Sequence, residues 1–408
     1  MDIREKMREG FRDLEGGLFS KVEKADVGDA AEKVARAGGD MLGWADPFMP
    51  DDCMPEEIKA LAIQRIQEGL SAHYTHPVGD PELKRAIARK LQRQNCLTVD
   101  PERNILVTPG SDSGLLFAMI PFIGPGDEVL VPDPSYPSNF LNPKLLGGKA
   151  VSVPLDEENG FRLTREALER ALSPRSKMVL LTNPNNPTST VFSREELTML
   201  AEFICEHDLV AVVDQAFEDF VFDGREMITL ASLPGMWERT ITVCSVSKGM
   251  AMSGVRVGYL TADDYIMDVL YGCAVNIIGA TNSTFQTAVA YALDHPELMM
   301  GGYYEVFEER RRKVHELLTG IPGVRTQLPQ SAFLTWVDVS DLGTAEEVSS
   351  YLMREAKVCV NAGTAYGKQG AGHIRIVHGC FQDSQRIYRA VGRVREALLK
   401  LGREKGLA

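Results

Sequence analysis

Between about residues 100 and 262, short apolar runs alternate with helical stretches, and this alternation restricts the possible fold more than any other feature. Each run is rich in β-branched residues and nearly continuous in its apolar character. The runs are ILVTPG (105–110), EVLVPDP (128–134), KMVLLTNP (177–184), LVAVVDQA (209–216), TITVCSVS (240–247) and VGYLTA (257–262). A helical pattern, SREELTMLAEFICEHD, fills 193–208. This order predicts an α/β fold with a largely parallel sheet that is covered by helices on both faces.

The length of the chain indicates a second domain. Its 408 residues are too many for one compact core. A long helical stretch at 285–320, which we expect to be interrupted near Pro296 and Gly301–Gly302, is followed by strand-like runs at 332–339 and 373–379. We therefore predict a large domain over 48–290 and a smaller α/β domain formed by 1–47 and 291–408.

Charge and cysteine usage narrow the class of partner. The formal net charge of −13 argues against binding to nucleic acid or to anionic lipid through a basic face. The first residues lack the apolar core of a secretory signal, and no run of about 18 apolar residues occurs. The seven cysteines are scattered without a CxxC pair or a neighbouring histidine cluster. We therefore expect reduced thiols, no metal site and a cytoplasmic location.

Polar residues collect where the predicted strands end. Ligands of parallel α/β sheets bind outside the carboxyl ends of the strands. The clusters at these ends are PGSD, PSYPSN, NPNNPT, DQAF and SVSK. Their placement predicts a binding site at this edge of the sheet.

The stretch SVSKGMAMSGVRVGY (245–259) contains the most reactive candidate, Lys248. A lysine held away from water has a lowered pKa, and its neutral amine can form a Schiff base with a carbonyl group. The plain alternative is a solvated surface lysine. The glycines that follow permit a turn that brings Arg256 back toward Ser245, where the two could bind a dianion.

The other strand ends offer compatible groups. The turn at 110–112 opens a predicted helix, so its backbone N–H groups could hold a phosphate, although an ordinary helix cap explains it equally well. Asp214 ends an apolar strand, where a carboxylate requires a cation or a hydrogen-bond donor. Asn186 fits either a ligand contact or a turn, and Tyr136 fits either stacking on a flat ring or packing.

Taken together, these stretches resemble the class I/II aminotransferases, which are fold type I enzymes that depend on pyridoxal 5′-phosphate (PLP). The matching stretches run in family order from about 43 to 379: YTHPVGDPELKRAIA, TPGSDSG, PDPSYPSN, NPNNPTST, VVDQAF, SVSKGMAMSGVRVGY and GHIRIVHG. The resemblance implies a large domain with a mostly parallel seven-stranded sheet and a smaller α/β domain. It also implies transfer of an amino group from an L-amino acid to a 2-oxo acid through a Lys248 Schiff base with PLP.

The resemblance assigns a role to each candidate residue. Lys248 matches the lysine that binds PLP and moves the Cα proton, Asp214 the acid beside the ring nitrogen, and Tyr136 the aromatic residue stacked on the ring. The residues that match the phosphate site are Gly110, Ser111, Asp112, Ser245, Arg256 and, from the second subunit of a homodimer with shared sites, Tyr74. The residues that match the substrate side are Arg375, which clamps the α-carboxylate, Gly43, and Asn186, which also bonds the phenolic oxygen of the ring.

Phe217 departs from the family, which has a tyrosine at this position. The phenolic oxygen of the cofactor loses one hydrogen bond, so we expect the pKa of the Schiff base to rise. This departure leaves open another PLP reaction on the same fold: elimination as in a C–S lyase, amino-acid cyclisation, oxidation or decarboxylation. A non-catalytic sensor that regulates transcription is a further alternative, but no basic helix-turn-helix precedes residue 43.

A second clamp for a distal substrate carboxylate is not evident in the sequence. The arginines at 310–312 lie in a charged helical stretch, and we interpret them as part of a solvated face. This interpretation argues against an enzyme dedicated to dicarboxylates, unless the partner subunit supplies the clamp.

Overall fold

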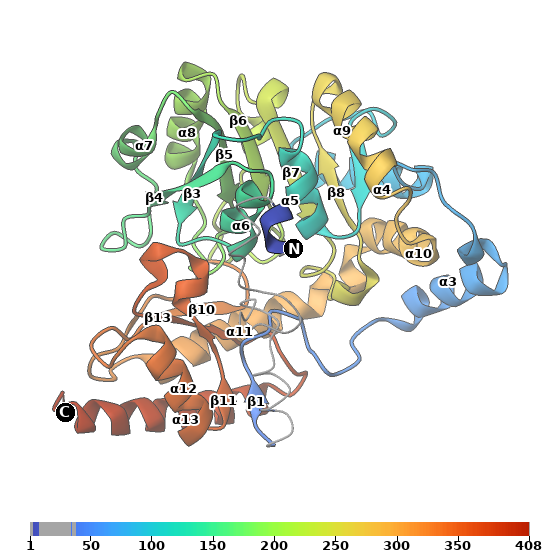
Figure 1. Cartoon of the computed structure of the whole chain (residues 1–408). Helices are drawn as coiled ribbons and strands as arrows, with labels where there is room; N and C mark the ends of the chain where they lie inside the picture. The colour runs from blue at the N-terminus through green and yellow to red at the C-terminus, as the bar shows by residue number, and fades with distance from the viewer. Residues whose placement is uncertain (1–2, 8–33, 35–37, 408) are drawn as a thin grey trace.

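Seven strands form the central sheet of the computed structural model, which describes residues 3–7, 34 and 38–407 (Figure 1). In spatial order they are β2 (Ile105–Thr108), β8 (Gly258–Thr261), β7 (Thr240–Ser245), β6 (Val210–Asp214), β5 (Ser176–Thr182), β3 (Glu128–Asp133) and β4 (Lys149–Pro154). All neighbours pair in parallel except β8, which is antiparallel to both β2 and β7. The predicted mostly parallel seven-stranded sheet is confirmed. Only β4 had no apolar run to mark it, because it is an edge strand whose side chains are mostly only partly buried.

Helices cover both faces of this sheet, as Figure 1 shows. Alternate residues of β5 point to opposite sides. Val179 and Leu181 pack toward α7 (Arg165–Ala171) and α8 (Arg194–Glu206), whereas Met178 and Leu180 pack toward α5 (Ser111–Met119) and α9 (Asp264–Ile277). Helix α8 begins where predicted because Ser193 and Glu196 cap each other's backbone N–H groups.

The remaining helices of this part lie near the two edges of the sheet. Helix α10 (Ser283–Asp294) packs against α3 (Glu56–Gln67) and α4 (Pro81–Asn95), and α6 (Pro137–Leu145) packs on β4. Helix α3 lies at the periphery in Figure 1 and exposes Ile63 and Ile66 to solvent. The short 3₁₀ segments are η1 (Ile3–Lys6), η2 (Leu70–Ala72), η3 (Leu230–Ser232), η4 (Trp237–Arg239), η5 (Ser253–Val255), η6 (Pro296–Leu298), η7 (Gly363–Tyr366) and η8 (Lys368–Gly370).

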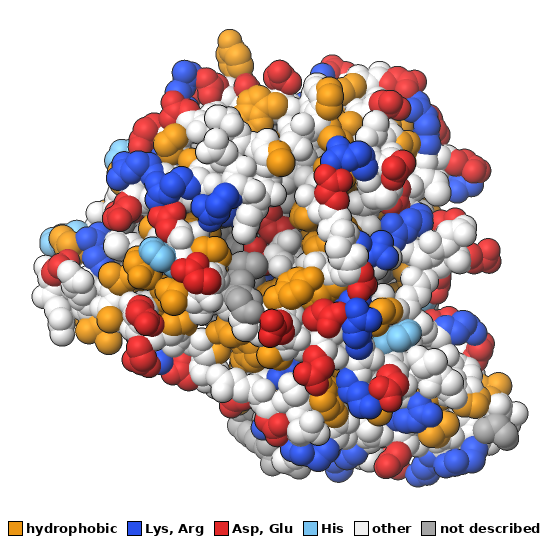
Figure 2. Space-filling view, turned by 180° about the vertical axis from the view of Figure 1, so that it is seen from behind, with side chains coloured by type: hydrophobic (Ala, Val, Ile, Leu, Met, Phe, Trp, Pro, Cys, Tyr) orange, Lys and Arg blue, Asp and Glu red, His pale blue; other side chains and the backbone are white. Residues whose placement is uncertain are grey.

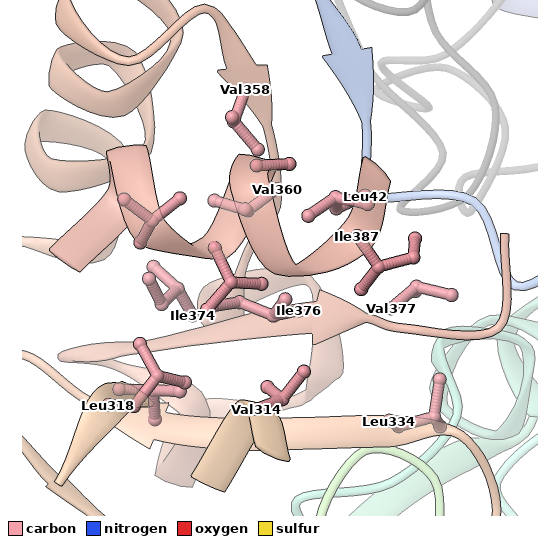
Figure 3. Close-up of a cluster of buried hydrophobic side chains, with 14 of the residues drawn as sticks. Leu42, Val314, Leu318, Leu334, Val358, Val360, Ile374, Ile376, Val377 and Ile387 are labelled. Carbon is pink, nitrogen blue, oxygen red and sulfur yellow. The ribbon is translucent and has the colours of Figure 1, made fainter. Parts of the chain in front are cut away.

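The second part of the molecule is built on a four-stranded antiparallel sheet. Its spatial order is β12 (Asn361–Ala362), β13 (His373–Val377), β10 (Leu334–Asp338) and β9 (Arg325–Thr326). Its helices are α11 (Met300–Leu318), α12 (Ala345–Glu355) and α13 (Ser384–Glu404), and β1 (Asp40–Met41) pairs with β11 (Val358–Cys359). Leu42 joins the apolar core of this part, beside Ile376 and Ile387 (Figure 3). The predicted domain boundaries stay predictions, and most of 1–37 lies outside the described residues.

Two sequence expectations about the 285–320 region are wrong in detail. The helix is interrupted at Pro296, but Gly301–Gly302 lie inside α11. Arg310 and Arg311 are fully buried rather than solvated, and only Arg312 is half-exposed. Arg310 stays buried because backbone carbonyls of the loop after β13, at 378–382, accept its N–H groups. Arg311 pairs with Asp223.

Charged side chains of both signs are interspersed over the face shown in Figure 2. This pattern gives that face no broad basic area of the kind that binds nucleic acid. Over the described ranges, no helix is both long enough and apolar enough to cross a membrane.

Candidate active site

Residues from the ends of five strands meet in a cavity of about 350 Å³. A cavity of this size takes a small molecule. The predicted residues that line it are Ser111, Asp112, Tyr136, Asn186, Asp214, Lys248 and Arg256. They follow β2, β3, β5, β6 and β7, so the parallel sheet brings together groups up to 145 residues apart in the chain.

Lys248 lies in the turn after β7. Its Nζ donates a hydrogen bond to the carbonyl of Ala45 and lies 6.0 Å from the centroid of the Phe217 ring. The amine is thus held inside the cavity, between a backbone carbonyl and an aromatic ring, and the interpretation as a solvated surface lysine is wrong.

Asp214 supplies a buried carboxylate at the end of β6. It is 4% exposed, and its Oδ1 accepts a hydrogen bond of 3.1 Å from the backbone N–H of Ala216. Burial, together with the nearby charge of Asp112, raises the pKa of Asp214 to about 7. A cationic ligand group beside this carboxylate would restore its ionised form.

The raised pKa of Asp214 predicts a pH-dependent stability of the cofactor-free protein. The unfolded chain releases this proton near pH 4 and the folded chain near pH 7, so the free energy of unfolding falls as pH rises across this window. The loss is at most about 4 kcal/mol. Denaturant melts at pH 5 and pH 8 should show a smaller difference for Asp214→Asn than for the wild type. Equal differences would contradict the assignment.

Arg256 and the start of α5 form the cationic end of the cavity. Arg256 Nη1 donates to the carbonyl of Ser253 at 2.7 Å, and Nη2 donates to that of Pro109 at 3.3 Å. Gly110, which precedes α5, has a φ of 86°, and a Cβ there would lie 2.4 Å from Arg256 Nη2. Glycine therefore lets the guanidinium reach the helix N-terminus, and together they suit a phosphate dianion.

Ser245 lies one layer behind the cavity wall. Its hydroxyl donates to Ser247 Oγ at 2.8 Å and accepts from the Ser247 N–H at 3.0 Å. Ser247 lines the cavity, whereas Ser245 does not. The predicted phosphate role of Ser245 remains a prediction, and Ser247 is the nearer hydroxyl.

Arg375 joins the two parts of the molecule. Its neighbours Ile374 and Ile376 point into the apolar core of Figure 3, so the alternation of β13 directs Arg375 to the other face. Nη1 donates to Asn186 Oδ1 at 2.9 Å, and Nη2 donates to the Gly43 carbonyl at 3.0 Å. All three predicted substrate residues therefore come together.

The segment 43–46 crosses from Arg375 to the lysine. Three bonds hold it: Arg375 to the Gly43 carbonyl, Lys248 to the Ala45 carbonyl, and Ser253 Oγ to Asp46 Oδ1 at 2.5 Å. Trp44, Ala45 and Asp46 line the cavity, as does Ser253. Sequence reasoning missed these four residues. Their only signal was the position of three of them directly after Gly43.

Phe217 lines the cavity and is 2% exposed. It packs edge-on against Phe333, with ring centroids 5.4 Å apart. Its side chain carries no hydrogen-bonding group, so this part of the wall is apolar.

Tyr74 is a predicted site residue that does not line the cavity of its own chain. It follows η2 and is 92% exposed. A role in the site would require a second subunit.

Comparison with known proteins identifies the family. Residues 40–394 match the family model for aminotransferase class I and II. The chain belongs to this family, and the predicted family, fold and aminotransferase activity are confirmed.

Three similar proteins are all named aminotransferases, but their names give different amino acids. An aspartate aminotransferase of Pyrococcus abyssi is 36% identical over 361 residues, which cover 88% of this chain and 91% of the relative. The aromatic-amino-acid aminotransferase 2 of Thermococcus litoralis is 36% identical over 331 residues, which cover 80% and 84%. The crystal structure of an aromatic aminotransferase from Pyrococcus horikoshii OT3 superposes with a TM-score of 0.85 at 32% identity, covering 93% and 99% of the two chains.

Proposed function

We propose that this aminotransferase binds PLP in the cavity and moves the amino group of an L-amino acid to a 2-oxo acid. The carrying observation is that Lys248, the buried carboxylate of Asp214 and the cationic end at Arg256 line one cavity. These residues fit the three functional groups of PLP. The amine of Lys248 can bond to the aldehyde, and the carboxylate of Asp214 can pair with the pyridinium nitrogen. Arg256 and the N-terminus of α5 can bind the phosphate.

Each residue then has a defined task. When bound, PLP supplies a ring that withdraws electrons from the substrate Cα. Asp214 holds the proton of the ring nitrogen, and Lys248 provides the covalent anchor and moves the proton that leaves the Cα. Arg375 would bind the α-carboxylate and so fix which Cα bond faces the ring. Tyr136 and Asn186 line the space that the ring would occupy.

We propose a homodimer in the cytoplasm with shared active sites. The arm formed by α3 and η2 exposes apolar side chains: Ile63, Ile66, Leu70 and Tyr74 are each more than two-fifths exposed. A second subunit that covers this arm would bury these side chains and carry Tyr74 to the phosphate end of the other cavity. In this proposal the large domain covers 48–290, and the small domain covers 1–47 and 291–408.

A half-reaction screen tests the proposed function. Purified protein loaded with PLP is mixed with single amino acids, and the cofactor spectrum is followed. We expect conversion to the pyridoxamine form with a donor, and return to the original spectrum on addition of a 2-oxo acid. Ammonia release without a 2-oxo acid would instead indicate elimination or oxidation, and carbon dioxide release would indicate decarboxylation.

Trp44 is placed to contact the donor side chain. A donor that reaches from Arg375 to Lys248 lies along the segment 43–46, and Trp44 is the large side chain of that segment in the cavity wall. Loss of its apolar area in Trp44→Ala should lower kcat/KM for phenylalanine by about 10- to 100-fold. Steady-state kinetics with phenylalanine and alanine as donors measure this ratio.

The alanine donor and a second variant serve as controls for Trp44. The methyl group of the donor alanine is too short to make much contact with the indole ring of Trp44, so kcat/KM for alanine should change little. The Trp44→Phe variant keeps an aromatic ring and should retain most of the activity with phenylalanine. An equal loss for both donors in Trp44→Ala would show that the ring only supports the fold.

A further inference from the structure

A buried polar network contacts the segment 214–219 from outside the cavity. Lys90 of α4 is 4% exposed, and its Nζ donates to Glu218 Oε1 and, at 2.9 Å, to Asn95 Oδ1. The other oxygen of Glu218 accepts from Asn95 Nδ2 at 2.7 Å and from Gln215 Nε2 at 3.0 Å. Both oxygens of this carboxylate are therefore bound by side chains that lie on α4 or directly after β6.

Thr229 closes the network. Its Oγ1 accepts from Asn95 Nδ2 at 2.8 Å and from Gln215 Nε2 at 3.2 Å. The end of α4, the segment after β6 and the segment before η3 are thus bonded to one another through buried side chains. Such a network permits few alternative arrangements, since any movement leaves a buried polar group without a partner.

The same segment faces the cavity with its other side chains. Asp214, Ala216 and Phe217 line the cavity, whereas Gln215 and Glu218 point to the network. Asp219, the next residue, fills the space beside Gly249: a Cβ at 249 would lie 1.7 Å from Asp219 Oδ2. The segment 214–219 therefore contains the candidate ring acid, Asp214, and lies against Gly249, the residue that follows the candidate Schiff-base lysine.

Stability alone does not account for a buried ion pair. Burial disfavours the charge of Lys90, yet its neighbours, first among them the Glu218 carboxylate and also Asp219, together outweigh this effect and raise the pKa of Lys90. Apolar residues of similar volume often replace such pairs without loss of stability. The geometry points to a second effect of the two charges: they fix the position of the segment 214–219, which lies between the ion pair and the cavity.

We propose that the Lys90–Glu218 pair positions the cofactor: it fixes the segment 214–219 so that Asp214 meets the ring nitrogen and Phe217 packs beside Lys248. This inference rests on the proposed function, because it requires PLP in the cavity. Lys90 and Glu218 are positioning residues and touch neither cofactor nor substrate. Their loss should weaken PLP binding and shift the pH at which the bound cofactor changes its spectrum.

The test uses the double variant Lys90→Met with Glu218→Gln. It removes both charges, and an amide at 218 still accepts hydrogen bonds from Asn95 and Gln215. We expect the Kd for PLP to rise about 3- to 30-fold. The pH midpoint of the bound-cofactor absorbance should move by about half a unit or more. A double variant with the wild-type Kd and midpoint would overturn the proposal.

Matched variants separate positioning from folding. Arg89→Met removes the exposed pair with Asp294 from the same helix, one residue away, and should leave Kd and midpoint unchanged. Lys90→Arg keeps the charge and should resemble the wild type. If thermal melting shows that the double variant is unfolded, Glu218→Asp provides the test: a smaller shift in the same direction supports the proposal, and no shift overturns it. A wild type that takes up no PLP would instead refute the proposed function.

Discussion

Replacement of Lys248 by alanine should reduce transamination by about 10⁴-fold, the upper range for loss of a positioned acid–base group. The Nζ of this residue is the amine that the structure holds inside the cavity, between the Ala45 carbonyl and the Phe217 ring. No water molecule would replace both its covalent bond to the cofactor and its placement for proton transfer. Stopped-flow measurement of the half-reaction with a saturating donor gives the rate.

The Lys248→Ala experiment includes a control for cofactor binding. Equilibrium dialysis should show that PLP still binds, because Asp214 and Arg256 are unchanged. Added methylamine, a small external base, should restore part of the rate. If the variant keeps more than a tenth of the wild-type rate, Lys248 is not the reacting amine.

Replacement of Arg375 by lysine should lower kcat/KM for amino acids by about 10²- to 10³-fold, because an ammonium cannot reproduce the planar, branched set of donors of the buried guanidinium. The guanidinium is fully buried and is fixed by Asn186, by the Gly43 carbonyl and by Asn361, whose Oδ1 accepts from Nη2 at 2.9 Å. A lysine ammonium offers one point charge and cannot satisfy these acceptors and a carboxylate together.

A comparison of substrates makes the Arg375 prediction specific. Steady-state rates are measured with an amino acid and with the corresponding amine, which lacks the α-carboxylate. The amine should lose little between wild type and variant. A similar loss for both substrates would mean that Arg375 supports the fold rather than the carboxylate. The melting temperature of the variant provides the control for folding.

Features that depend on local sequence were predictable. The strands at β5, β6 and β7 follow from continuous apolar runs, and α8 follows from its capping residues. The break at Pro296 follows from the missing N–H of proline. Lys248 and Asp214 were found because a charged residue directly after an apolar strand requires a partner.

Other features depend on partners distant in the chain. Arg310 and Arg311 resemble solvated helix residues, yet carbonyls at 378–382 and the Asp223 carboxylate hold them in the interior. Trp44 and Asp46 carry no local signal, and they reach the cavity because Arg375 and Lys248 bond to the backbone between 43 and 46. The edge strand β4 was missed because it buries too little to need an apolar run.

The sequence by itself determined the parallel sheet, the family and the reactive groups at the strand ends. The spacing of apolar residues, the capping of helices and the charged residues after strands are all set by residues that are neighbours in the chain. Only the tertiary structure decided that Ser247 rather than Ser245 lines the cavity, that Arg375 and Lys248 bond to the backbone on either side of Trp44, and that Lys90 reaches Glu218. Those contacts join residues up to 332 positions apart, and each is fixed by packing of whole elements against one another. No local pattern encodes such packing.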